Sequence, residues 1–406
     1  MQVKGQKIPV SRRSSPVTRL DKPDLPFDSD ERWMRLALAL ALKGRFETSP
    51  NPIVGACVVL KGKLVGQGWH KRFGGPHAEA MALRQAGKKA KGAVLYVTLE
   101  PCSSWGKTPP CVDAIIQSGI REVIFAVQDP NPKHAGRAAA LLKKAGVRVR
   151  KGLLAREAES QNETFFKWIQ TGRPFVTLKM AQTLDGKIAT RTGQSRWISS
   201  LQSRELVQNL RRSHDAVLVG KNTLLMDNPR LSVRGKDVFR PLRGGKDLHG
   251  RDVVDVMSCR PLRVVLDPRC EVPAGAKIFT GTPAVLLAIG EKALKKASLR
   301  SWKKPVTLLP LKEIKGRLDL NQLLKKLGAL GVASLLVEGG GETAWSFLSQ
   351  KQVDRVIWIT APKIFGGRGA KTSVEGEGVA LPAQALNLKS WTVFPCGSDF
   401  VLEGRL

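Results

Sequence analysis

Acidic residues are scarce in this sequence of 406 residues. Asp and Glu together number 34 against 67 Lys and Arg, so the formal net charge is +33 at pH 7. Such a balance suits anionic partners, namely nucleic acid, acidic lipid or phosphorylated metabolites. The basic residues are scattered along the whole chain and form no single block. A solvated basic surface is therefore the simpler explanation, and attraction of phosphates would be an addition to it.

Long apolar runs are also missing. The longest, Leu36 to Leu42, is far shorter than the ~20 residues of a membrane-spanning helix. Residues 11–14, Ser-Arg-Arg-Ser, resemble a twin-arginine export signal only faintly, since prolines and charged residues follow in place of an apolar segment. We therefore expect neither a membrane span nor export, and we expect a cytoplasmic location.

Cysteine is too rare for a disulfide framework in a chain of this length. The six cysteines stand at positions 57, 102, 111, 259, 270 and 396. Four of them are expected to be buried thiols in a reducing compartment. The other two, Cys102 and Cys111, belong to the stretch around which the chain is organised.

That stretch begins with His77-Ala78-Glu79 and continues, after a strand-like run, with Pro101-Cys102 and then Cys111. One imidazole and two thiols can occupy three corners of a zinc tetrahedron and leave the fourth to water, as in a catalytic site. Glu79 is placed to shuttle the protons of a zinc-activated water. Each part alone is more often an ordinary histidine or a buried cysteine. Together they are typical of zinc deaminases that act on cytosine and adenine rings.

Composition and periodicity divide the chain into three segments. These are a basic, proline-bearing and disordered tail at 1–27, a first domain at 28–172 and a second at 173–406, with the boundary at Gly172-Arg173-Pro174. In the first domain, helices and strands alternate as in a layered α/β sheet. We expect one helix that ends near Gly44, others at 77–85, 110–118, 135–145 and 153–169, and strands at 53–60, 64–69, 94–99, 122–127 and 147–149.

The second domain has another α/β alternation and is no repeat of the first. We expect strands at 175–180, 216–219, 262–266, 284–288, 306–309, 334–337 and 353–359, helices at 200–212, 318–330 and 342–348, and a loop at 235–260. The strand at 334–337 leads into Glu338 and three glycines just before a helix. Such an arrangement can cradle phosphates, although a glycine-rich turn is by itself more often only a turn.

Seven short segments follow one another in a characteristic order. They are TSPNPIVG (48–55), HAE (77–79), GKTPPC (106–111), DPNP (129–132), TLDGK (183–187), DNP (227–229) and VEGGG (337–341). From about residue 28 onward, the chain thereby resembles the bifunctional deaminase/reductase family of riboflavin biosynthesis. The resemblance implies a cytidine-deaminase-like three-layer domain followed by a dihydrofolate-reductase-like α/β domain.

The family carries out two reactions on one pathway intermediate. The resemblance implies that the first domain hydrolyses the 2-amino group of 2,5-diamino-6-(5-phosphoribosylamino)pyrimidin-4-one. It implies that the second domain uses NADPH to reduce the ribosyl C1′ and so forms a ribityl chain. The phosphorylated pyrimidine is then the expected partner, with neither nucleic acid nor membrane, and the chain is expected to form a homo-oligomer.

The resemblance also implies roles for individual residues. One zinc ion would be held by His77, Cys102 and Cys111, with Glu79 as the proton shuttle. The pyrimidine and the ribose phosphate would be surrounded by Asn51, His70, Lys107, Thr108, Asp129 and Asn131. In the reductase, NADPH would contact Ala181, Trp197, Thr223, Asp227, Gly340 and Gly341, and the substrate would contact Lys179, Ser195, Arg211, Leu231, Arg234 and Glu338.

Two positions depart from the family pattern. The family often has a histidine where this chain has Ser104, so a substrate contact from that side chain is lost or replaced. After DPNP the family commonly has Gly-x-Gly, and this chain has Gly136-Arg137-Ala138, which loosens the assignment of that loop.

A nucleic-acid base deaminase with an accessory domain is the main alternative, because the positive charge would favour phosphate neutralisation. Such enzymes usually space their thiols as Cys-x-x-Cys, whereas eight residues separate Cys102 from Cys111, and they have no use for a second α/β domain. A non-enzymatic binding protein would tolerate the loss of Glu79 or of a thiol, and none is lost.

Overall fold

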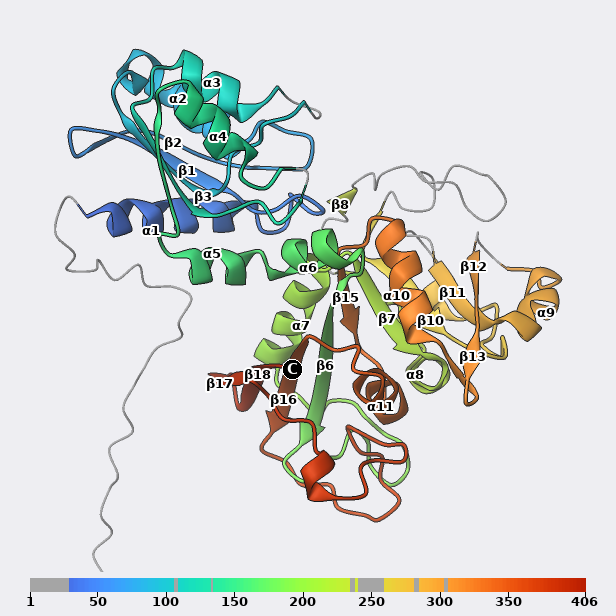
Figure 1. Ribbon diagram of the computed structural model, residues 1–406. Coiled ribbons are helices and arrows are strands. Elements are labelled where there is room, and N and C mark those ends of the chain that lie inside the picture. The colour runs from blue at the N-terminus through green and yellow to red at the C-terminus, as the bar shows by residue number, and fades with distance from the viewer. Residues whose placement is uncertain are drawn as a thin grey trace, which may run out of the picture.

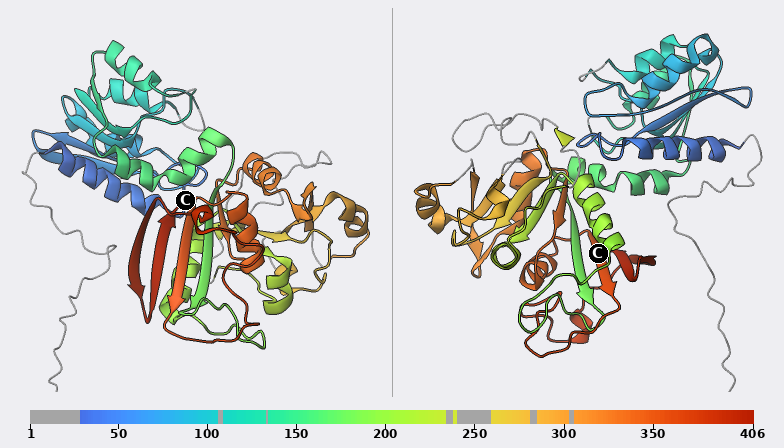
Figure 2. Two further views of the ribbon diagram at one scale, coloured as in Figure 1. Left: turned by 60° about the horizontal axis from the view of Figure 1, so that its bottom comes forward. Right: turned by 180° about the vertical axis from the view of Figure 1, so that it is seen from behind.

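The structure is a computed structural model, and it describes residues 29–105, 109–132, 134–233, 238–239, 259–280, 285–302 and 306–406. Two bodies, each built on its own sheet, follow one another along the chain (Figures 1 and 2). The first sheet has five strands and the second has nine. Both domains have helices on the two faces of the sheet, so each is a layered α/β structure as the alternation predicted.

The first sheet has the strand order β2-β1-β3-β4-β5. Its strands are β1 (Gly55–Leu60), β2 (Lys63–Trp69), β3 (Val94–Leu99), β4 (Glu122–Val127) and β5 (Arg148–Lys151). β1 pairs antiparallel with both β2 and β3, and β3, β4 and β5 run parallel. The carboxyl ends of β3 and β4 therefore meet at one edge, where ligands of open α/β sheets bind.

Helices cover both faces of this sheet. α1 (Asp30–Ala41) and α5 (Ala155–Gln161) lie on one face, and α2 (Ala78–Ala86), α3 (Cys111–Gln117) and α4 (Arg137–Lys144) lie on the other (Figure 1). α1 begins at Ser29, whose side chain accepts a hydrogen bond from the Arg32 amide, as its N-cap residues predicted. Gly55 allows α1 to approach β1 closely, because a Cβ there would lie 2.0 Å from the Ala37 carbonyl oxygen.

The helix predicted at 153–169 is wrong as a single element. The structure has α5 and then α6 (Glu163–Thr171), with a break at Asn162. Asn162 is buried, and its side-chain amide exchanges two hydrogen bonds of 2.9 Å with the backbone of Ile53. These bonds fix Asn162 at φ −117°, ψ 17°, outside the α-helical region, and redirect α6 toward the second domain.

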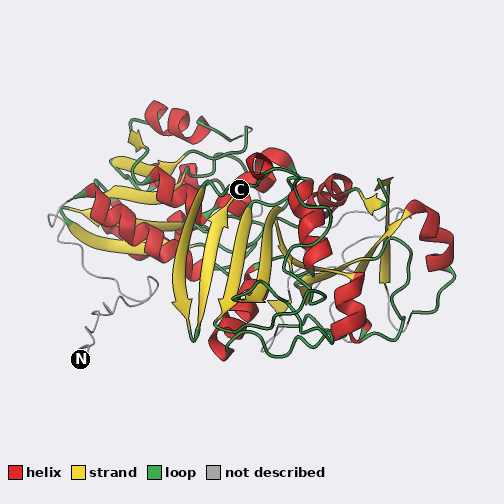
Figure 3. Ribbon diagram, turned by 90° about the horizontal axis from the view of Figure 1, so that it is seen from below, coloured by secondary structure: helices red, strands yellow, loops and turns green. Residues whose placement is uncertain are grey.

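The second sheet has the order β12-β11-β10-β7-β15-β6-β16-β18-β17, and Figure 3 shows several of its strands side by side. They are β6 (Phe175–Thr183), β7 (Ala216–Gly220), β10 (Leu262–Leu266), β11 (Val285–Gly290), β12 (Val306–Leu311), β15 (Ser334–Val337), β16 (Arg355–Ala361), β17 (Ser390–Cys396) and β18 (Asp399–Arg405). The strands from β12 to β16 are parallel, and β18 and β17 add an antiparallel edge.

Two apolar cores cover the faces of the second sheet. One includes α10 (Leu320–Ala329) and α11 (Gly341–Ser349), and the other includes α7 (Leu201–Ser213) and Leu224 of α8 (Lys221–Asp227). Beyond these, the structure has α9 (Leu294–Ser298) and the short hairpin of β13 (Glu313–Ile314) with β14 (Arg317–Leu318). Sequence reasoning missed α8, α9, this hairpin and the last two strands of the sheet.

The predicted loop at 235–260 falls largely outside the described residues. Its described parts are two short strands that pair antiparallel, β8 (Val238–Phe239) and β9 (Cys259–Arg260). The predicted tail at 1–27 also lies outside the described residues.

Ion pairs and hydrogen bonds join the two domains. Glu163 of α6 accepts hydrogen bonds from Arg405 at 2.8 and 2.9 Å, and the Ser49 hydroxyl donates to the Asp215 carboxylate at 2.8 Å. Further contacts are the Lys167–Asp354 ion pair and the hydrogen bond from the Trp168 indole to the Gly328 carbonyl. α6 is therefore the main contact between the domains.

Two sequence predictions about the whole chain can be compared with the described residues. Within them, no helix is both long and apolar enough to cross a membrane. Cys57, Cys102, Cys111, Cys270 and Cys396 are free thiols, as expected for a chain without a disulfide framework.

Candidate active sites

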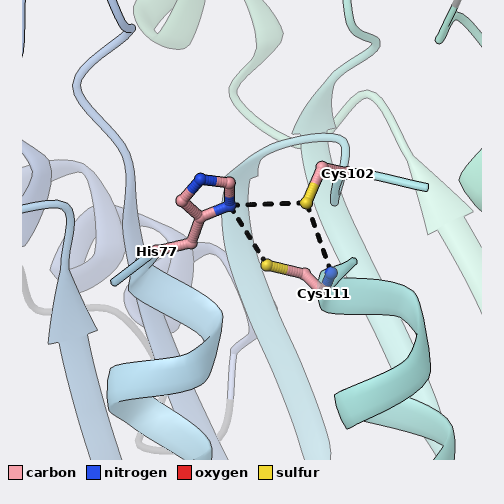
Figure 4. A group of neighbouring side chains, drawn as sticks. All are labelled: His77, Cys102 and Cys111. Carbon is pink, nitrogen blue, oxygen red and sulfur yellow. Dashed lines mark hydrogen bonds between the residues drawn. The ribbon is translucent and has the colours of Figure 1, made fainter. Parts of the chain in front are cut away.

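His77, Cys102 and Cys111 come together at the edge of the first sheet where β3 ends (Figure 4). His77 is the residue before α2, Cys102 follows β3, and Cys111 is the first residue of α3. The Nδ1 atom of His77 lies 3.4 Å from the Cys102 sulfur and 3.3 Å from the Cys111 sulfur. The predicted ligand set thus converges on one point from three separate elements.

This arrangement fits a zinc ion. Two sulfurs and one nitrogen bound tetrahedrally to zinc lie about 3.6 Å apart at the N–S edges, as follows from the usual Zn–S and Zn–N lengths. The observed N–S distances differ from that value by only a few tenths of an ångström. Hydrogen bonds from Cys111 and His77 also lower the pKa of the Cys102 thiol, which favours the thiolate that binds metal.

Glu79 lies in the first turn of α2 and is 4% exposed. Burial raises the pKa of its carboxyl above the usual value, while the neighbouring His77 acts in the opposite direction. A carboxyl group that can hold a proton near neutral pH is suited to general acid–base chemistry. The geometry therefore places a candidate proton carrier beside a candidate metal site.

A cavity of about 340 Å³ opens beside these residues. On one wall, the Asn51 amide donates to Nε2 of His70 at 3.2 Å, and Nδ1 of His70 is 3.1 Å from the Pro76 carbonyl oxygen. Burial lowers the pKa of His70, which favours the neutral ring that these two bonds require. Asp129 and Asn131 line the same cavity. Four of the six predicted pyrimidine-side residues are therefore gathered there, and the other two, Lys107 and Thr108, lie outside the described residues.

Sequence reasoning missed Glu100, which positions the loop that carries Asp129. Its buried carboxylate accepts hydrogen bonds from the amides of Asp129 at 3.2 Å and Gly136 at 3.0 Å. Gly136 has φ +76°, a conformation that favours glycine. Glu100 immediately precedes Pro101-Cys102, so one residue ties the metal loop to the opposite wall of the cavity.

The second domain has a cavity of about 580 Å³ at the carboxyl ends of its parallel strands. Its walls come from the segment after β7, the glycines after β15 and the β13–β14 hairpin. The residues of the predicted cofactor and substrate sets that line it are Ser195, Thr223, Asp227, Gly340 and Gly341. Ser195 donates to the Asp227 carboxylate at 3.1 Å, and the Gly340 amide donates to the Thr223 hydroxyl at 3.1 Å. Sequence reasoning missed Arg317, a cation on this wall that pairs with Glu342 at 3.3 Å.

The three consecutive glycines of this cavity differ in why a side chain is absent. A Cβ at Gly339 would lie 2.3 Å from Thr343, and one at Gly341 would lie 2.5 Å from Glu375, so packing explains both. A Cβ at Gly340 would meet only Thr223 and Ile188, at 3.8 and 3.9 Å, and both of these residues line the cavity. The backbone at Gly340 has φ −78°, which any residue can adopt. Nothing in the protein itself requires a glycine at position 340, which fits a backbone surface left bare for a dinucleotide.

Three residues of the predicted reductase substrate set form a buried ion cluster. Arg211 donates to the Glu338 carboxylate at 2.6 and 2.9 Å, and the Lys179 amine lies 3.8 Å from it. Burial opposes the charge of Glu338, but Arg211 holds the pKa of that carboxyl below its usual value. Burial lowers the pKa of Lys179, while Glu338 acts in the opposite direction.

The remaining predicted residues are placed as follows. Leu231 is buried in the apolar core beside α7, Ala181 lies on β6 and is partly buried, and Trp197 is 60% exposed beneath the Arg204 guanidinium. None of the three lines the larger cavity. Arg234 lies outside the described residues. Their contacts with a ligand stay predictions.

Comparison with known proteins decides the family. A family model for the RibD C-terminal domain matches residues 174–402, and one for the cytidine and deoxycytidylate deaminase zinc-binding region matches residues 27–127. The riboflavin biosynthesis protein RibD of Aquifex aeolicus is 44% identical over 92% of this chain and 97% of its own length. This chain belongs to the RibD family. The RibD of Escherichia coli is 42% identical and covers 83% of this chain and 89% of its own length.

Solved RibD structures have the same fold. Acinetobacter baumannii RibD, form 1, aligns with a TM-score of 0.79 at 34% identity, over 94% of this chain and 99% of its own. A diaminohydroxyphosphoribosylaminopyrimidine deaminase/5-amino-6-(5-phosphoribosylamino)uracil reductase of Thermotoga maritima aligns with a TM-score of 0.77 at 35% identity, over 92% and 98% of the two chains. The predicted fold class, a deaminase-like domain followed by a reductase-like domain, is confirmed.

Proposed function

We propose that this RibD-family protein is a bifunctional enzyme of riboflavin biosynthesis. It deaminates 2,5-diamino-6-(5-phosphoribosylamino)pyrimidin-4-one and then reduces the ribosyl group to ribityl with NADPH. The observation that carries the proposal is the convergence of His77, Cys102 and Cys111 beside buried Glu79, in a chain whose second domain matches the RibD reductase model.

The first reaction replaces the 2-amino group of the ring with oxygen from water and releases ammonia. His77, Cys102 and Cys111 would hold the zinc ion, which lowers the pKa of a bound water toward neutrality. Glu79 takes a proton from the attacking water and delivers one to the departing nitrogen. Asn51 and His70 form a wall that can orient the ring by hydrogen bonds.

The second reaction adds a hydride to C1′ and a proton to the oxygen released from C1′ as the ribose opens. NADPH supplies the hydride when bound. The bare backbone at Gly340 and the start of α11 can receive its phosphates, and Thr223 and Asp227 form the facing wall. The protein's part in this step is to hold donor and acceptor together.

A two-step assay tests the whole proposal. Without NADPH, the zinc-loaded protein should release one ammonia per diaminopyrimidine ribotide. With NADPH added, absorbance at the NADPH band should fall only after deamination has begun. Ammonia release from RNA in place of the ribotide would instead support the nucleic-acid deaminase.

We propose the domain limits 28–172 and 173–406, and a fragment of residues 28–172 should still bind zinc and deaminate. The five strands of the first sheet lie between residues 55 and 151, and its two apolar cores draw on residues 33 to 166. Only the outer contacts of α6, such as Glu163 with Arg405, are lost. Zinc content and ammonia release of the fragment check this, and a soluble but inert fragment would contradict it.

The positive charge should act on small phosphates and not on polynucleotides. Arg211, one of the cations predicted to meet the substrate, is already held by Glu338 inside the protein and offers no exposed track for a phosphate backbone. An excess of single-stranded RNA at physiological salt should leave the apparent KM for the ribotide unchanged. Competitive inhibition by RNA would count against this prediction.

We also propose a cytoplasmic location and a homo-oligomeric state. The free thiols among the described residues support the reducing compartment. Light scattering of the purified chain measures the number of subunits.

A further inference from the structure

The deaminase cavity contains an imidazole that the proposed mechanism leaves unused. His134 follows the 129–132 segment and precedes α4, and it lines the cavity together with Asp129 and Asn131. Its Nδ1 atom lies 3.2 Å from the Ser104 hydroxyl, which belongs to the loop that begins at Cys102. The two sides of the cavity thus meet through one hydrogen bond between side chains.

His134 lies on a fixed loop. Its amide donates to the Asn131 carbonyl at 2.9 Å, and its own carbonyl accepts from the Arg137 amide at 3.0 Å. The residues on either side of it, Asp129 and Gly136, are both held by the Glu100 carboxylate. With the loop anchored on both sides and Nδ1 held by Ser104, the ring keeps one orientation.

The position of His134 in the cavity indicates which part of the substrate it meets. The loop leads from the metal ligand Cys102 through Ser104 to Trp105, which is 76% exposed, so Ser104 lies between the metal and the mouth. The ring that loses its amino group must lie at the metal. The phosphoribosyl group extends away from that point and passes the level of Ser104.

We propose that His134 is a substrate-binding residue that donates a hydrogen bond from Nε2 to an oxygen of the substrate's phosphoribosyl group, and that Ser104 is the positioning residue for its ring. The Ser104 hydroxyl donates to Nδ1, which leaves the ring proton on Nε2. The acceptor is a phosphate oxygen or a ribose hydroxyl. This inference rests on the proposed deaminase function and adds a specificity residue to it.

Two substitutions of His134 separate its two nitrogen positions. In His134→Asn, the side-chain amide can still meet Ser104 but nothing reaches the Nε2 position. In His134→Gln, the amide nitrogen reaches the Nε2 position without needing Ser104. With the full-length, zinc-loaded protein, His134→Asn and His134→Ala should each raise KM for the ribotide about tenfold, the size of one hydrogen bond to a polar ligand, with kcat nearly unchanged. His134→Gln should recover most of that loss.

Ser104→Ala should raise KM less, by about threefold, because the contact survives in a less ordered ring. Added to His134→Ala, it should have no further effect, since the hydroxyl acts only through the ring. Ser118→Ala is the matched control, because Ser118 bonds the Ile115 carbonyl at the end of α3 and does not line the cavity.

The dephosphorylated riboside identifies the acceptor. If the penalty of His134→Ala appears with the ribotide and vanishes with the riboside, the acceptor is the phosphate. If it persists with both, the acceptor is a ribose hydroxyl. Calorimetric titration with the deaminated ribotide should show the same loss of affinity independently of turnover.

The failures of the two proposals are distinguishable. A wild-type protein that releases no ammonia from the ribotide would refute the deaminase function itself. A wild-type protein that deaminates, with His134→Ala and His134→Asn showing unchanged KM and unchanged zinc content, would overturn the role of His134 alone. Additive effects of Ser104→Ala and His134→Ala would overturn the positioning role of Ser104.

Discussion

Replacing Glu79 with glutamine should lower the rate of deamination by about a thousandfold, within the range that a positioned proton carrier contributes. The zinc content should stay at one ion per chain. Glutamine has nearly the same shape as glutamate and can fill the buried site in the first turn of α2, but it cannot take a proton from water and pass it on. Ammonia release and metal analysis of the same preparation measure the two properties.

A matched control comes from another buried glutamate of the same domain. Glu122 begins β4 and accepts hydrogen bonds from Arg148 and Arg150, and it does not line the deaminase cavity. Glu122→Gln should cost some stability through these ion pairs and leave kcat for deamination nearly unchanged. Reduction of directly supplied deaminated ribotide should be normal in both variants. An active Glu79→Gln protein, or one that has lost its zinc, would remove the proton-carrier role.

The metal site was predictable from sequence because its parts are short and chemically distinctive. His77 and Glu79 lie two residues apart at a helix start, and a proline marks Cys102. The structure adds what no spacing could supply, namely that the three ligand atoms meet within 4.8 Å of one another. Local chemistry therefore identified the ligands, and the ends of β3, α2 and α3 supply their geometry.

The elements that sequence reasoning missed depend on distant contacts or are short. The break at Asn162 is caused by the backbone of Ile53, 109 residues earlier, and a periodicity confined to 153–169 carries no sign of it. Glu100 acts on amides about 30 to 40 residues away. α8 has seven residues and follows β7 without a loop, so it is too short for a helical period to be seen.

The pairing of Ser104 with His134 belongs to the same class. In the sequence, Ser104 is only a departure from a family pattern, and no motif distinguishes His134. The two become neighbours because Glu100 draws the 129–136 loop toward the metal loop. A residue that seems lost at one position can thus be answered from a loop 30 residues later, and only the folded chain shows it.

Replacing Gly340 with valine should raise the dissociation constant for NADPH at least tenfold, the equivalent of about 1.4 kcal/mol. The backbone at this position is compatible with valine, and a Cβ would stand in ordinary contact distance of Thr223 and Ile188. The added methyl groups would therefore occupy the cavity itself and keep phosphates from the amides at the start of α11. Fluorescence titration with NADPH measures the constant without any turnover.

The controls for this substitution separate loss of the cofactor from loss of the fold. Gly275 is exposed, a Cβ there would have no neighbour within 4 Å, and the residue does not line the cavity, so Gly275→Val should bind NADPH normally. Gly341→Ala should instead destabilise the domain, because its Cβ would lie 2.5 Å from Glu375 and 2.6 Å from the Thr372 carbonyl oxygen. Ammonia release from the ribotide should be unchanged in Gly340→Val, since the zinc site lies in the other domain. Normal NADPH binding by that variant would mean that the glycine run is only a turn and that the dinucleotide binds elsewhere in residues 174–403.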